Sequence, residues 1–173
     1  MNSDNACSTS PIFRTSNSID LKIISGGQTG VDRAALDFAL TWGIPCGGTC
    51  PAERKAEDGP IDKKYPLEEA HSEDYRYRTR QNVVQSHGTL IVYHQKLGKG
   101  TQLTLDFCLA KKRPHLEIDA SRFSPQEAAQ QLAEFVQNHF IGILNIAGPR
   151  ASSWPQGHAY VSKCLEIFIQ CPS

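Results

Sequence analysis

The 173-residue chain has no excess of either charge, because 18 lysine and arginine residues balance 18 aspartate and glutamate residues. Without a basic excess it has no general electrostatic attraction to nucleic acid or to an anionic membrane surface. It also lacks a run of about 18 apolar residues, the length that a membrane-spanning helix needs. We therefore expect neither nucleic acid nor a membrane as partner, and any anionic ligand must be small and held locally.

Several motifs of metal and hydrolytic chemistry are also missing. The six histidines form no His-x-x-x-His or His-x-x-x-x-His pair, and Cys46 and Cys50 have neither thioredoxin spacing nor a second pair for zinc. We therefore expect no metal held by protein ligands. The Gly-x-Ser-x-Gly sequence of one large hydrolase class is absent. No apolar signal core follows the amino terminus, which together with isolated cysteines favours a reduced, cytoplasmic setting.

What the sequence does contain is an alternation of short apolar runs and amphipathic stretches. The apolar runs predict strands near residues 21–25, 44–46, 89–93, 115–118 and 141–147. Helical spacing predicts helices near 31–42, 74–86, 101–111, 124–136 and 160–169. This alternation is typical of a parallel sheet with helices on both faces. We predict one α/β, Rossmann-like ligand-binding domain over residues 19–173, with about five or more strands, after a disordered tail at 1–18 rich in Ser, Asn and Thr.

Glycines follow three of the predicted strands. In a parallel sheet the carboxyl ends of the strands meet at one edge, where ligands bind. Glycine there lets backbone amides approach an anion, and a helix amino terminus adds about half a positive charge. The alternative for the first loop is a tight turn in which Asp32 only favours the helix dipole. The glycines expected to form a phosphate-binding cradle are Gly26, Gly27, Gly30, Gly98, Gly100 and Gly148.

Polar side chains near these loops could complete the cradle. Arg33 follows the first glycine loop and could give a forked donor to phosphate or carboxylate. On the helix at 74–86, Arg78 and Asn82 are four residues apart and share a face. Asn82 is an unexpected polar residue beside two valines, so it could cap the helix or contact a ligand.

The segment 47–73 is rich in glycine, proline and charge and has no sustained period. A connection of this length inside a domain is a binding loop or lid, or is disordered. It carries Glu57 and Asp58, which are the catalytic candidates if the protein is an enzyme, although adjacent carboxylates are usually only solvated. A general base there would need a pKa raised by burial.

Six segments in order along residues 21–170 match the pattern of a known family: Gly-Gly-Gln-Thr-Gly-Val-Asp-Arg-Ala-Ala-Leu-Asp (26–37), Cys-Pro-Ala-Glu-Arg-Lys-Ala-Glu-Asp-Gly (50–59), Tyr-Pro-Leu-Glu-Glu (65–69), Arg-Thr-Arg-Gln-Asn-Val (78–83), Gly-Thr-Leu-Ile-Val (88–92) and Asn-Ile-Ala-Gly-Pro-Arg (145–150). Together they resemble the putative molybdenum carrier family. That family belongs to the Rossmann-like SLOG superfamily, which also holds the cytokinin-activating phosphoribohydrolases.

The resemblance implies a ligand pocket above the strand ends and self-association, as a dimer or tetramer. Its ligand would be a nucleotide or a pterin phosphate, with the molybdenum cofactor (molybdopterin) as the named candidate. The pterin dithiolene would hold the metal. Carried over to this sequence, the pocket residues are Gly27, Gln28, Thr29, Gly30, Arg54, Asp58, Arg78, Asn82, Gly100, Thr101 and Arg150.

Two positions depart from the related patterns. The family commonly has aspartate before the third strand, where this chain has His87. The phosphoribohydrolases carry a catalytic glutamate three residues after a Gly-Thr pair, where this chain has Thr104. Without that carboxylate, phosphoribohydrolase chemistry by the known route is not expected.

We therefore predict a cytoplasmic binding protein for a phosphorylated nucleotide-like or pterin ligand, in line with a molybdenum cofactor carrier. In this interpretation Arg33 and Arg150 neutralise the phosphate, and the segment 47–73 covers the ligand. One alternative is a nucleotide or nucleoside-phosphate hydrolase that uses Asp58 or Glu57 as general base. Another is a nucleotide sensor that signals to a partner.

Overall fold

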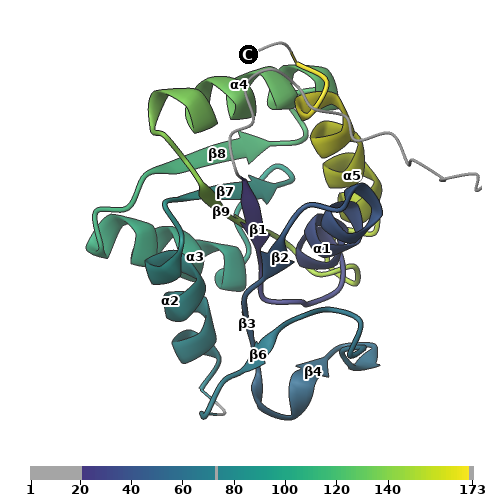
Figure 1. Cartoon of the computed structure of the whole chain (residues 1–173), viewed down its shortest axis with the longest axis vertical. Helices are drawn as coiled ribbons and strands as arrows, with labels where there is room; N and C mark the ends of the chain where they lie inside the picture. Colours follow the sequence, from purple (N-terminus) through teal and green to yellow (C-terminus); the bar gives the residue numbers. More distant parts are fainter. Residues whose placement is uncertain (1–20, 73, 172–173) are drawn as a thin grey trace, which may run out of the picture.

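The computed structural model describes residues 21–72 and 74–171. Its centre is a five-stranded parallel sheet (Figure 1). In spatial order the strands are β2 (Cys46–Gly47), β1 (Lys22–Ile24), β9 (Ile143–Ala147), β7 (Gly88–Tyr93) and β8 (His115–Asp119). The predicted α/β class with a parallel sheet is confirmed. The predicted tail at 1–18 lies outside the described residues.

The order of the strands relates the sheet to a known arrangement. β9, the last strand of the chain, lies in the middle of the sheet, paired with β1 on one side and β7 on the other. If the numbering began at β9, the spatial order would be 3-2-1-4-5, as in the doubly wound Rossmann sheet. The chain thus has the first strand of that arrangement at its carboxyl end. In such sheets the order reverses between strands 1 and 4, here β9 and β7, and ligands bind in the crevice at that point.

Helices cover both faces of the sheet, as the sequence predicted (Figure 1). Packed together on one face are α1 (Val31–Trp42), α4 (Pro125–Asn138) and α5 (Gly157–Phe168), and on the other α2 (Tyr75–Gln85) and α3 (Lys99–Ala110). The predicted start of α4 is confirmed, because Ser124 and Glu127 form a reciprocal capping box with proline in the first turn. None of the helices in the described ranges is long and apolar enough to cross a membrane.

The main core lies between the sheet and the helices α1, α4 and α5. Fully buried strand residues such as Ile23, Leu144 and Ile146 meet the apolar faces of these helices. Alanines of α1 let this helix approach the sheet closely. The core therefore fixes the position of α1 and the strand ends beside it.

The segment after β2 forms short strands around a second, smaller core. β3 (Thr49–Cys50) pairs with β6 (Glu68–Glu69) in parallel, and β4 (Lys55–Ala56) pairs with β5 (Gly59–Pro60) in antiparallel fashion. A turn of 3-10 helix, η1 (Ala52–Arg54), precedes β4. We call residues 51–69 the flap. Its buried residues Ile61, Tyr65 and Leu67 pack against Cys50 of β3 and Leu36 of α1.

Arg54 holds the flap in its own shape. Its guanidinium and Nε donate to four backbone carbonyls, those of Ile61, Asp62, Tyr65 and Leu67, at 2.8–3.1 Å. A single cation thus satisfies the carbonyls of a loop that has little regular structure. Its donors are occupied within the flap.

Candidate functional site

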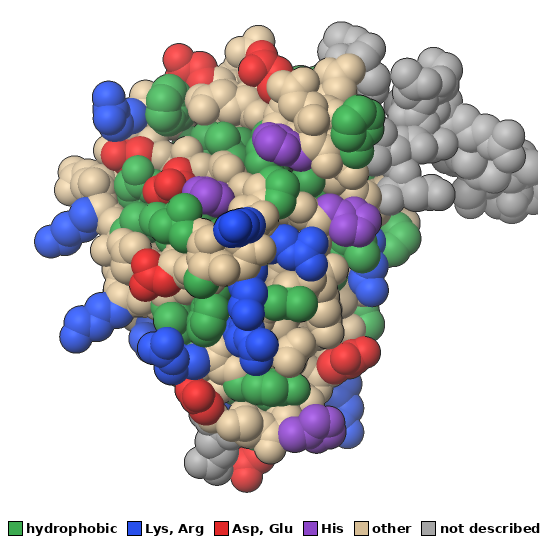
Figure 2. All heavy atoms as spheres, turned by 90° about the vertical axis from the view of Figure 1, so that its left-hand side faces the viewer, with side chains coloured by type: hydrophobic (Ala, Val, Ile, Leu, Met, Phe, Trp, Pro, Cys, Tyr) green, Lys and Arg blue, Asp and Glu red, His purple; other side chains and the backbone are tan. Residues whose placement is uncertain are grey.

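A cavity of about 370 Å³ opens at the carboxyl ends of β1, β9 and β7. This is the crevice that the strand order indicates, and its volume lies in the range of small-molecule sites. Its walls come from the loop after β1, the loop after β9, one side of α2, and the loop after β7 with the first turn of α3. Lys and Arg side chains gather near the middle of the face that carries α2 and α3 (Figure 2).

A buried ion pair forms part of the cavity wall. Arg78 of α2 and Asp32 of α1 meet at 3.3 Å between Nη1 and Oδ2, and their side chains are 7% and 6% exposed. The Arg78 guanidinium lies 4.2 Å from the centre of the Tyr75 ring. Its Nε has no hydrogen-bond partner among the described residues. Because a buried donor without a partner is costly, Arg78 is a strong candidate to meet a ligand atom.

The position of this arginine leaves no room for a side chain at Gly26, just after β1. A Cβ at Gly26 would lie 1.3 Å from Nη1 of Arg78. The guanidinium therefore occupies the space that any side chain at position 26 would need. This is a close approach of a side chain to the backbone, where the sequence analysis expected the approach of a ligand.

Asp32 already occupies donors of the first glycine loop. Its carboxylate accepts hydrogen bonds from the backbone amides of Gln28 and Gly148 as well as from Arg78. Burial raises the pKa of Asp32, and the nearby Arg78 charge and these hydrogen bonds partly offset that rise. The amide of Val31, at the start of α1, donates to the carbonyl of Pro149 at 3.2 Å. The amino end of α1 therefore has an internal anion where a phosphate was expected.

The amino end of α3 is different. Its N-cap, Gly98, makes no side-chain cap, and no acidic residue lies in its first turn. The whole stretch from Gly98 to Thr101 lines the cavity. The first amides of a helix have no partner within the helix and carry the positive end of its dipole. Lys96 and Lys99 add exposed positive charge to the same wall. This end of the cavity is therefore suited to an anion.

Aromatic rings form another part of the wall. His94, directly after β7, stacks on Trp154 of the loop after β9, with ring centres 5.6 Å apart and an interplanar angle of 27°. Trp154 is nearly buried and also packs against Tyr160. Tyr75 of α2 lines the cavity as well. Such rings are suited to stacking on a planar heterocycle.

Two buried asparagines border the cavity but already have partners. Asn82 accepts from the amide of Thr49 at 2.7 Å and donates to the carbonyl of the same residue at 2.9 Å. It therefore joins α2 to β3. Asn145 of β9 donates to the hydroxyl of Thr89 at 3.3 Å. Both contribute polar surface to the cavity while fixing the strands beneath it.

Glu57, near the tip of the flap, is bonded to the edge of the cavity. It accepts hydrogen bonds from the hydroxyl of Thr29 and from the amide and hydroxyl of Ser152. Nε of Arg150 lies 3.9 Å from its Oε2. These hydrogen bonds, first from Ser152 and then from Thr29, lower the pKa of Glu57. This is the opposite of the raised pKa that a general base would need.

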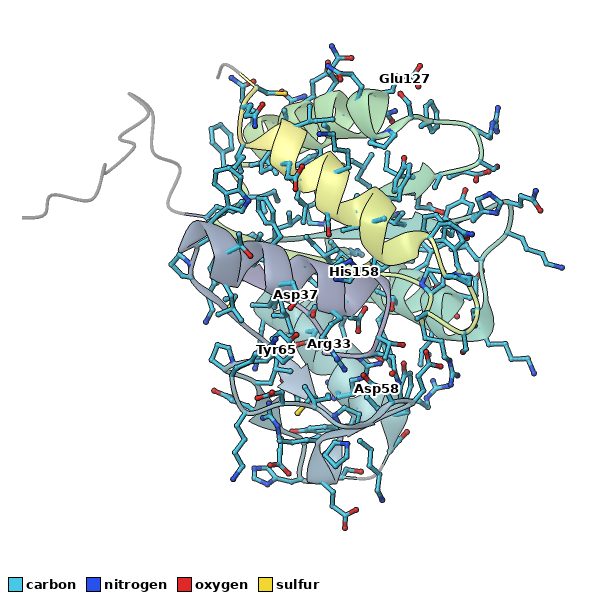
Figure 3. The ribbon with its side chains drawn as sticks, turned by 90° about the vertical axis from the view of Figure 1, so that its right-hand side faces the viewer. Arg33, Asp37, Asp58, Tyr65, Glu127 and His158 are labelled. Atoms are coloured by element: carbon cyan, nitrogen blue, oxygen red, sulfur yellow. The ribbon has the colours of Figure 1, made fainter. Side chains whose placement is uncertain are left out.

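The rest of the flap attaches to α1, which in turn contacts α5, along the seam that Figure 3 shows. Arg33 pairs with Asp58 through two contacts of 3.2 and 3.3 Å and donates to the carbonyl of Gly27. Asp37 accepts from the Tyr65 hydroxyl at 2.6 Å and lies 2.9 Å from Nε2 of His158. Arg33 and Asp58 are therefore committed to holding the flap.

The structure brings most of the predicted site residues to one cavity and leaves the others beside it. Among the described residues, no part of the flap lines the cavity, so the flap lies beside the ligand site and does not cover it. The predicted residues that line the cavity are Gly26, Gln28, Arg78, Asn82, Gly98, Gly100, Thr101, Gly148 and Arg150. The predicted residues placed outside its wall are Gly27, Thr29, Gly30, Arg33, Arg54, Glu57 and Asp58.

Sequence reasoning missed other parts of the wall. Lys96 lies two residues before a glycine pair, and Lys99 lies between the two glycines, which were noticed for their backbone alone. Asn145 had a usable signal, since it is a polar residue inside an apolar strand. The aromatic wall had none, because His94 and Trp154 are sixty residues apart in the sequence. The missed residues that carry charge, aromatic rings or hydrogen-bonding groups are Asp32, Tyr75, Thr79, His94, Lys96, Lys99, Thr104, Asn145, Ser153 and Trp154.

The two departures from the related patterns have different consequences. Thr104 is buried in the cavity wall and directs its hydroxyl to the carbonyl of Gly100, so this position supplies no carboxylate. His87 lies before β7, at the opposite end of that strand from the cavity. Its Nδ1 accepts from the amides of Gly142 and Ile143 at 3.1 and 3.2 Å. A carboxylate could accept the same two bonds, so this histidine has a structural role.

Across residues 21–72 and 74–171, no cluster of three or more His, Cys, Asp or Glu side chains could hold a metal ion. The cavity instead offers cations, amides and rings, which are groups that bind an anionic or aromatic molecule.

Comparisons with known proteins agree with this fold. The family described as "Circularly permutated YpsA SLOG family" matches residues 23–169. A solved structure, a putative molybdenum carrier protein from Syntrophus aciditrophicus SB, is 47% identical, with a TM-score of 0.84 over 86% of this chain and 94% of that one. A comparison with curated proteins finds no match. The permutation in the family's description corresponds to the place of β9 in the sheet, and the match spans nearly the whole described fold: the chain belongs to the circularly permuted YpsA SLOG family.

Proposed function

We propose that this protein binds a small phosphorylated ligand with a planar ring in the cavity at the ends of β1, β9 and β7, and carries it without converting it. The candidate cargo is the molybdenum cofactor, a pterin phosphate, and the second candidate is a nucleotide. The observation that carries the proposal is Arg78, a buried arginine in the cavity wall whose Nε lacks a partner among the described residues. A buried donor of this kind lowers the stability of the folded protein unless a ligand or a water molecule accepts a hydrogen bond from it.

The anionic group of the ligand is assigned to the amino end of α3. There the amides of Lys99, Gly100 and Thr101 border the cavity without an acidic neighbour in the first turn. At the amino end of α1, by contrast, Asp32 already accepts the bonds that a phosphate would accept. A phosphate beside Asp32 would meet a like charge, which makes the α3 end the better site.

The planar ring is assigned to the aromatic wall. His94 and Trp154, which stack on each other, both line the cavity, and aromatic rings can stack on a flat heterocycle of any identity. A pterin and a purine both satisfy this requirement. The name of the 47% identical structure favours the pterin.

A carrier is favoured over a hydrolase by the carboxylates near the cavity. Asp32 lines the cavity and has a pKa raised by burial, but its carboxylate is already bonded to Arg78 within the wall, and Glu57 has a lowered pKa and lies outside the cavity wall. Asp58 is paired with Arg33 and also lies outside the wall. Since a general base must reach the reacting atoms and accept a proton readily, these groups support binding better than catalysis.

The test reverses one charge at the amino end of α3. Lys99→Glu places an acid in the first helical turn, which favours the helix but repels a bound phosphate. We expect it to weaken binding of adenosine 5′-monophosphate and of inorganic phosphate by about tenfold or more, the effect of roughly one hydrogen bond to a charged group. Arg80→Glu makes the same charge change on the exposed side of α2 and should alter affinity less than about twofold. Equal effects of the two variants would contradict the assignment.

The identity of the cargo needs a separate experiment. Protein purified from a molybdenum-replete host would be examined by native mass spectrometry, and the ejected small molecules identified. A pterin phosphate that bears molybdenum supports the carrier function, and a nucleotide or a cleaved product directs the next assay to hydrolysis. The same spectra report the oligomeric state, for which we propose a dimer or tetramer, and the cysteines described as free thiols suit the cytoplasmic location that we propose.

A further inference from the structure

Beside the cavity lies another group of donors that converge on one anion, and a carboxylate of the protein itself fills it. Glu57 accepts from the hydroxyl of Thr29, from the amide of Ser152 at 3.0 Å and from the hydroxyl of Ser152. Nε of Arg150 lies 3.9 Å from the same carboxylate. We call Thr29, Arg150 and Ser152 the rim nest. Two separate loops, after β1 and after β9, thus aim their donors at one carboxylate.

The rim nest is continuous with the cavity. Arg150 belongs to both, and Gln28 and Ser153, the direct neighbours of Thr29 and Ser152 in the chain, line the cavity wall. The rim nest therefore borders the cavity at Arg150.

The group that fills the nest is attached to a segment with other anchors. The flap keeps its shape through Arg54 and stays on α1 through Tyr65 and Asp37. Glu57 holds the flap only through its carboxylate and its backbone amide, which donates to Oε1 of Gln28 at 3.0 Å. Its departure would therefore leave the base of the flap in place.

We propose that the rim nest is a second anion subsite, and that the ligand carries two anionic groups, one bound at the amino end of α3 and one that displaces Glu57. This inference rests on the proposed function, because it extends the same cavity. The ligand class is a phosphorylated heterocycle with a second oxyanion, a phosphate or a carboxylate, on the side away from the first. The carboxylate of Glu57 has the chemistry of the group that replaces it.

Glu57 competes with such a ligand, because it is tethered at a high effective concentration. A ligand with one anionic group gains nothing from the nest and leaves Glu57 bound. A ligand with two anionic groups gains hydrogen bonds from Thr29 and Ser152 and the charge of Arg150. Because Glu57 must leave these donors, its own bonds to them are lost when the ligand binds. The natural protein therefore shows only a small preference for the second charge, and removal of Glu57 exposes the full preference.

The experiment compares Glu57→Ala with Asp58→Ala. Both variants remove one negative charge from neighbouring positions of the flap, but Asp58 has its contact with Arg33 and none with the nest. The one-anion probe is adenosine 5′-monophosphate, and the two-anion probes are adenosine 3′,5′-bisphosphate and 2′,5′-bisphosphate. Each is titrated by calorimetry at fixed ionic strength, and the measured quantity is the affinity ratio of two-anion to one-anion probe.

We expect Glu57→Ala to raise this ratio about tenfold for at least one bisphosphate, and Asp58→Ala to change it less than about twofold. An equal change in both variants would mean that only the general loss of charge matters, and the second subsite would be rejected. If neither the natural protein nor the variants bind any probe, the proposed function itself is rejected. If the probes bind but the affinity ratio does not change, only the second subsite is rejected.

A measurement on the natural protein does not depend on how the variants fold. Amide hydrogen exchange is followed for the peptide around residues 55–59, where the Glu57 amide donates to Gln28. We expect the two-anion probe to accelerate exchange at Glu57, and adenosine 5′-monophosphate at matched saturation to leave it unchanged. Equal protection with both probes would overturn the displacement of Glu57.

Discussion

Removal of the Arg78 charge is the sharpest test of the buried pair. Arg78→Met keeps an unbranched side chain but removes the guanidinium, and it leaves the Asp32 carboxylate with only the amides of Gln28 and Gly148. Breaking a buried pair from one side costs about 3–5 kcal/mol. Because two donors remain on Asp32, we expect a loss near the lower limit, about 3 kcal/mol. For a domain of this size that corresponds to a fall in melting temperature of roughly 6–12 °C.

The loss should depend on pH in a definite direction. Burial raises the pKa of Asp32 above its usual 3.8 in the folded state, so the folded state binds more protons than the unfolded state just above that pH. Stability contributed by this group therefore falls as pH rises through the window between the two pKa values. In Arg78→Met the charge and hydrogen bond that lower the pKa are gone, so the window extends upward. The variant should lose most at about pH 8 and clearly less near pH 5.

Chemical denaturation at both pH values measures these differences. Arg80→Met, on the exposed side of the same helix, is the control and should change stability by less than about 0.5 kcal/mol. The double variant Asp32→Asn with Arg78→Met should be more stable than Arg78→Met alone at about pH 8, because no buried charge is left without its partner. A loss under about 1 kcal/mol, or an equal loss at both pH values, would refute the role assigned to the pair.

Three further changes test other contacts. Gly26→Ala should displace the Arg78 guanidinium, since the new Cβ would lie 1.3 Å from Nη1; calorimetric titration should then show loss of adenosine 5′-monophosphate binding, and adding Arg78→Met should cost little more. His87→Ala should lower the free energy of unfolding by about 1 kcal/mol, whereas His87→Asp should restore it, because a carboxylate can accept the same two amides. Tyr65→Phe removes the 2.6 Å bond to Asp37 and should cost about 1–2 kcal/mol and speed proteolysis within the flap, while nucleotide affinity stays unchanged because the flap does not line the cavity.

The fold was predictable because the apolar periods are regular. Strands and helices alternate with clear stops, such as Gly43 after α1 and the Ser124 cap before α4. Each of these signals is local, so a single sequence is enough to read it. The order of the strands could not be predicted in this way, because the place of β9 between β1 and β7 depends on pairing between residues more than fifty positions apart.

The place of the cavity was predictable from the sequence, but the contacts that the residues around it make were not. Glycines at strand ends indicated the edge of the sheet where the cavity lies, and Arg78, Arg150 and Thr101 line it. Glycine alone does not say which molecule approaches it, however. At position 26 the neighbour is the Arg78 side chain, which belongs to this protein. Sequence spacing could not reveal that, because the two residues are brought together only by the packing of α2 over the end of β1.

The long connection after β2 shows the same limit. Its composition indicated a lid or disorder, yet Ile61, Tyr65 and Leu67 build a small core on Leu36. These three residues stand at unequal intervals and carry no sustained period, so they give no secondary-structure signal. Arg54, expected in the pocket, is used to satisfy the carbonyls of this segment. A polar residue in a loop with many unpaired carbonyls is as well explained by the loop as by a ligand.

The distribution of internal carboxylates decides where a ligand anion can bind. Asp32 occupies the donors at the start of α1, and Glu57 occupies those of the rim nest. The amino end of α3 has no such internal anion in its first turn. Since Asp32 is buried and paired with Arg78, a ligand that displaced it would leave a buried polar group without its partner, which is costly, whereas Glu57 sits on an exposed tip and can move into water. The three positions therefore differ in kind: one is fixed, one is open, and one is held by a group that a ligand can replace.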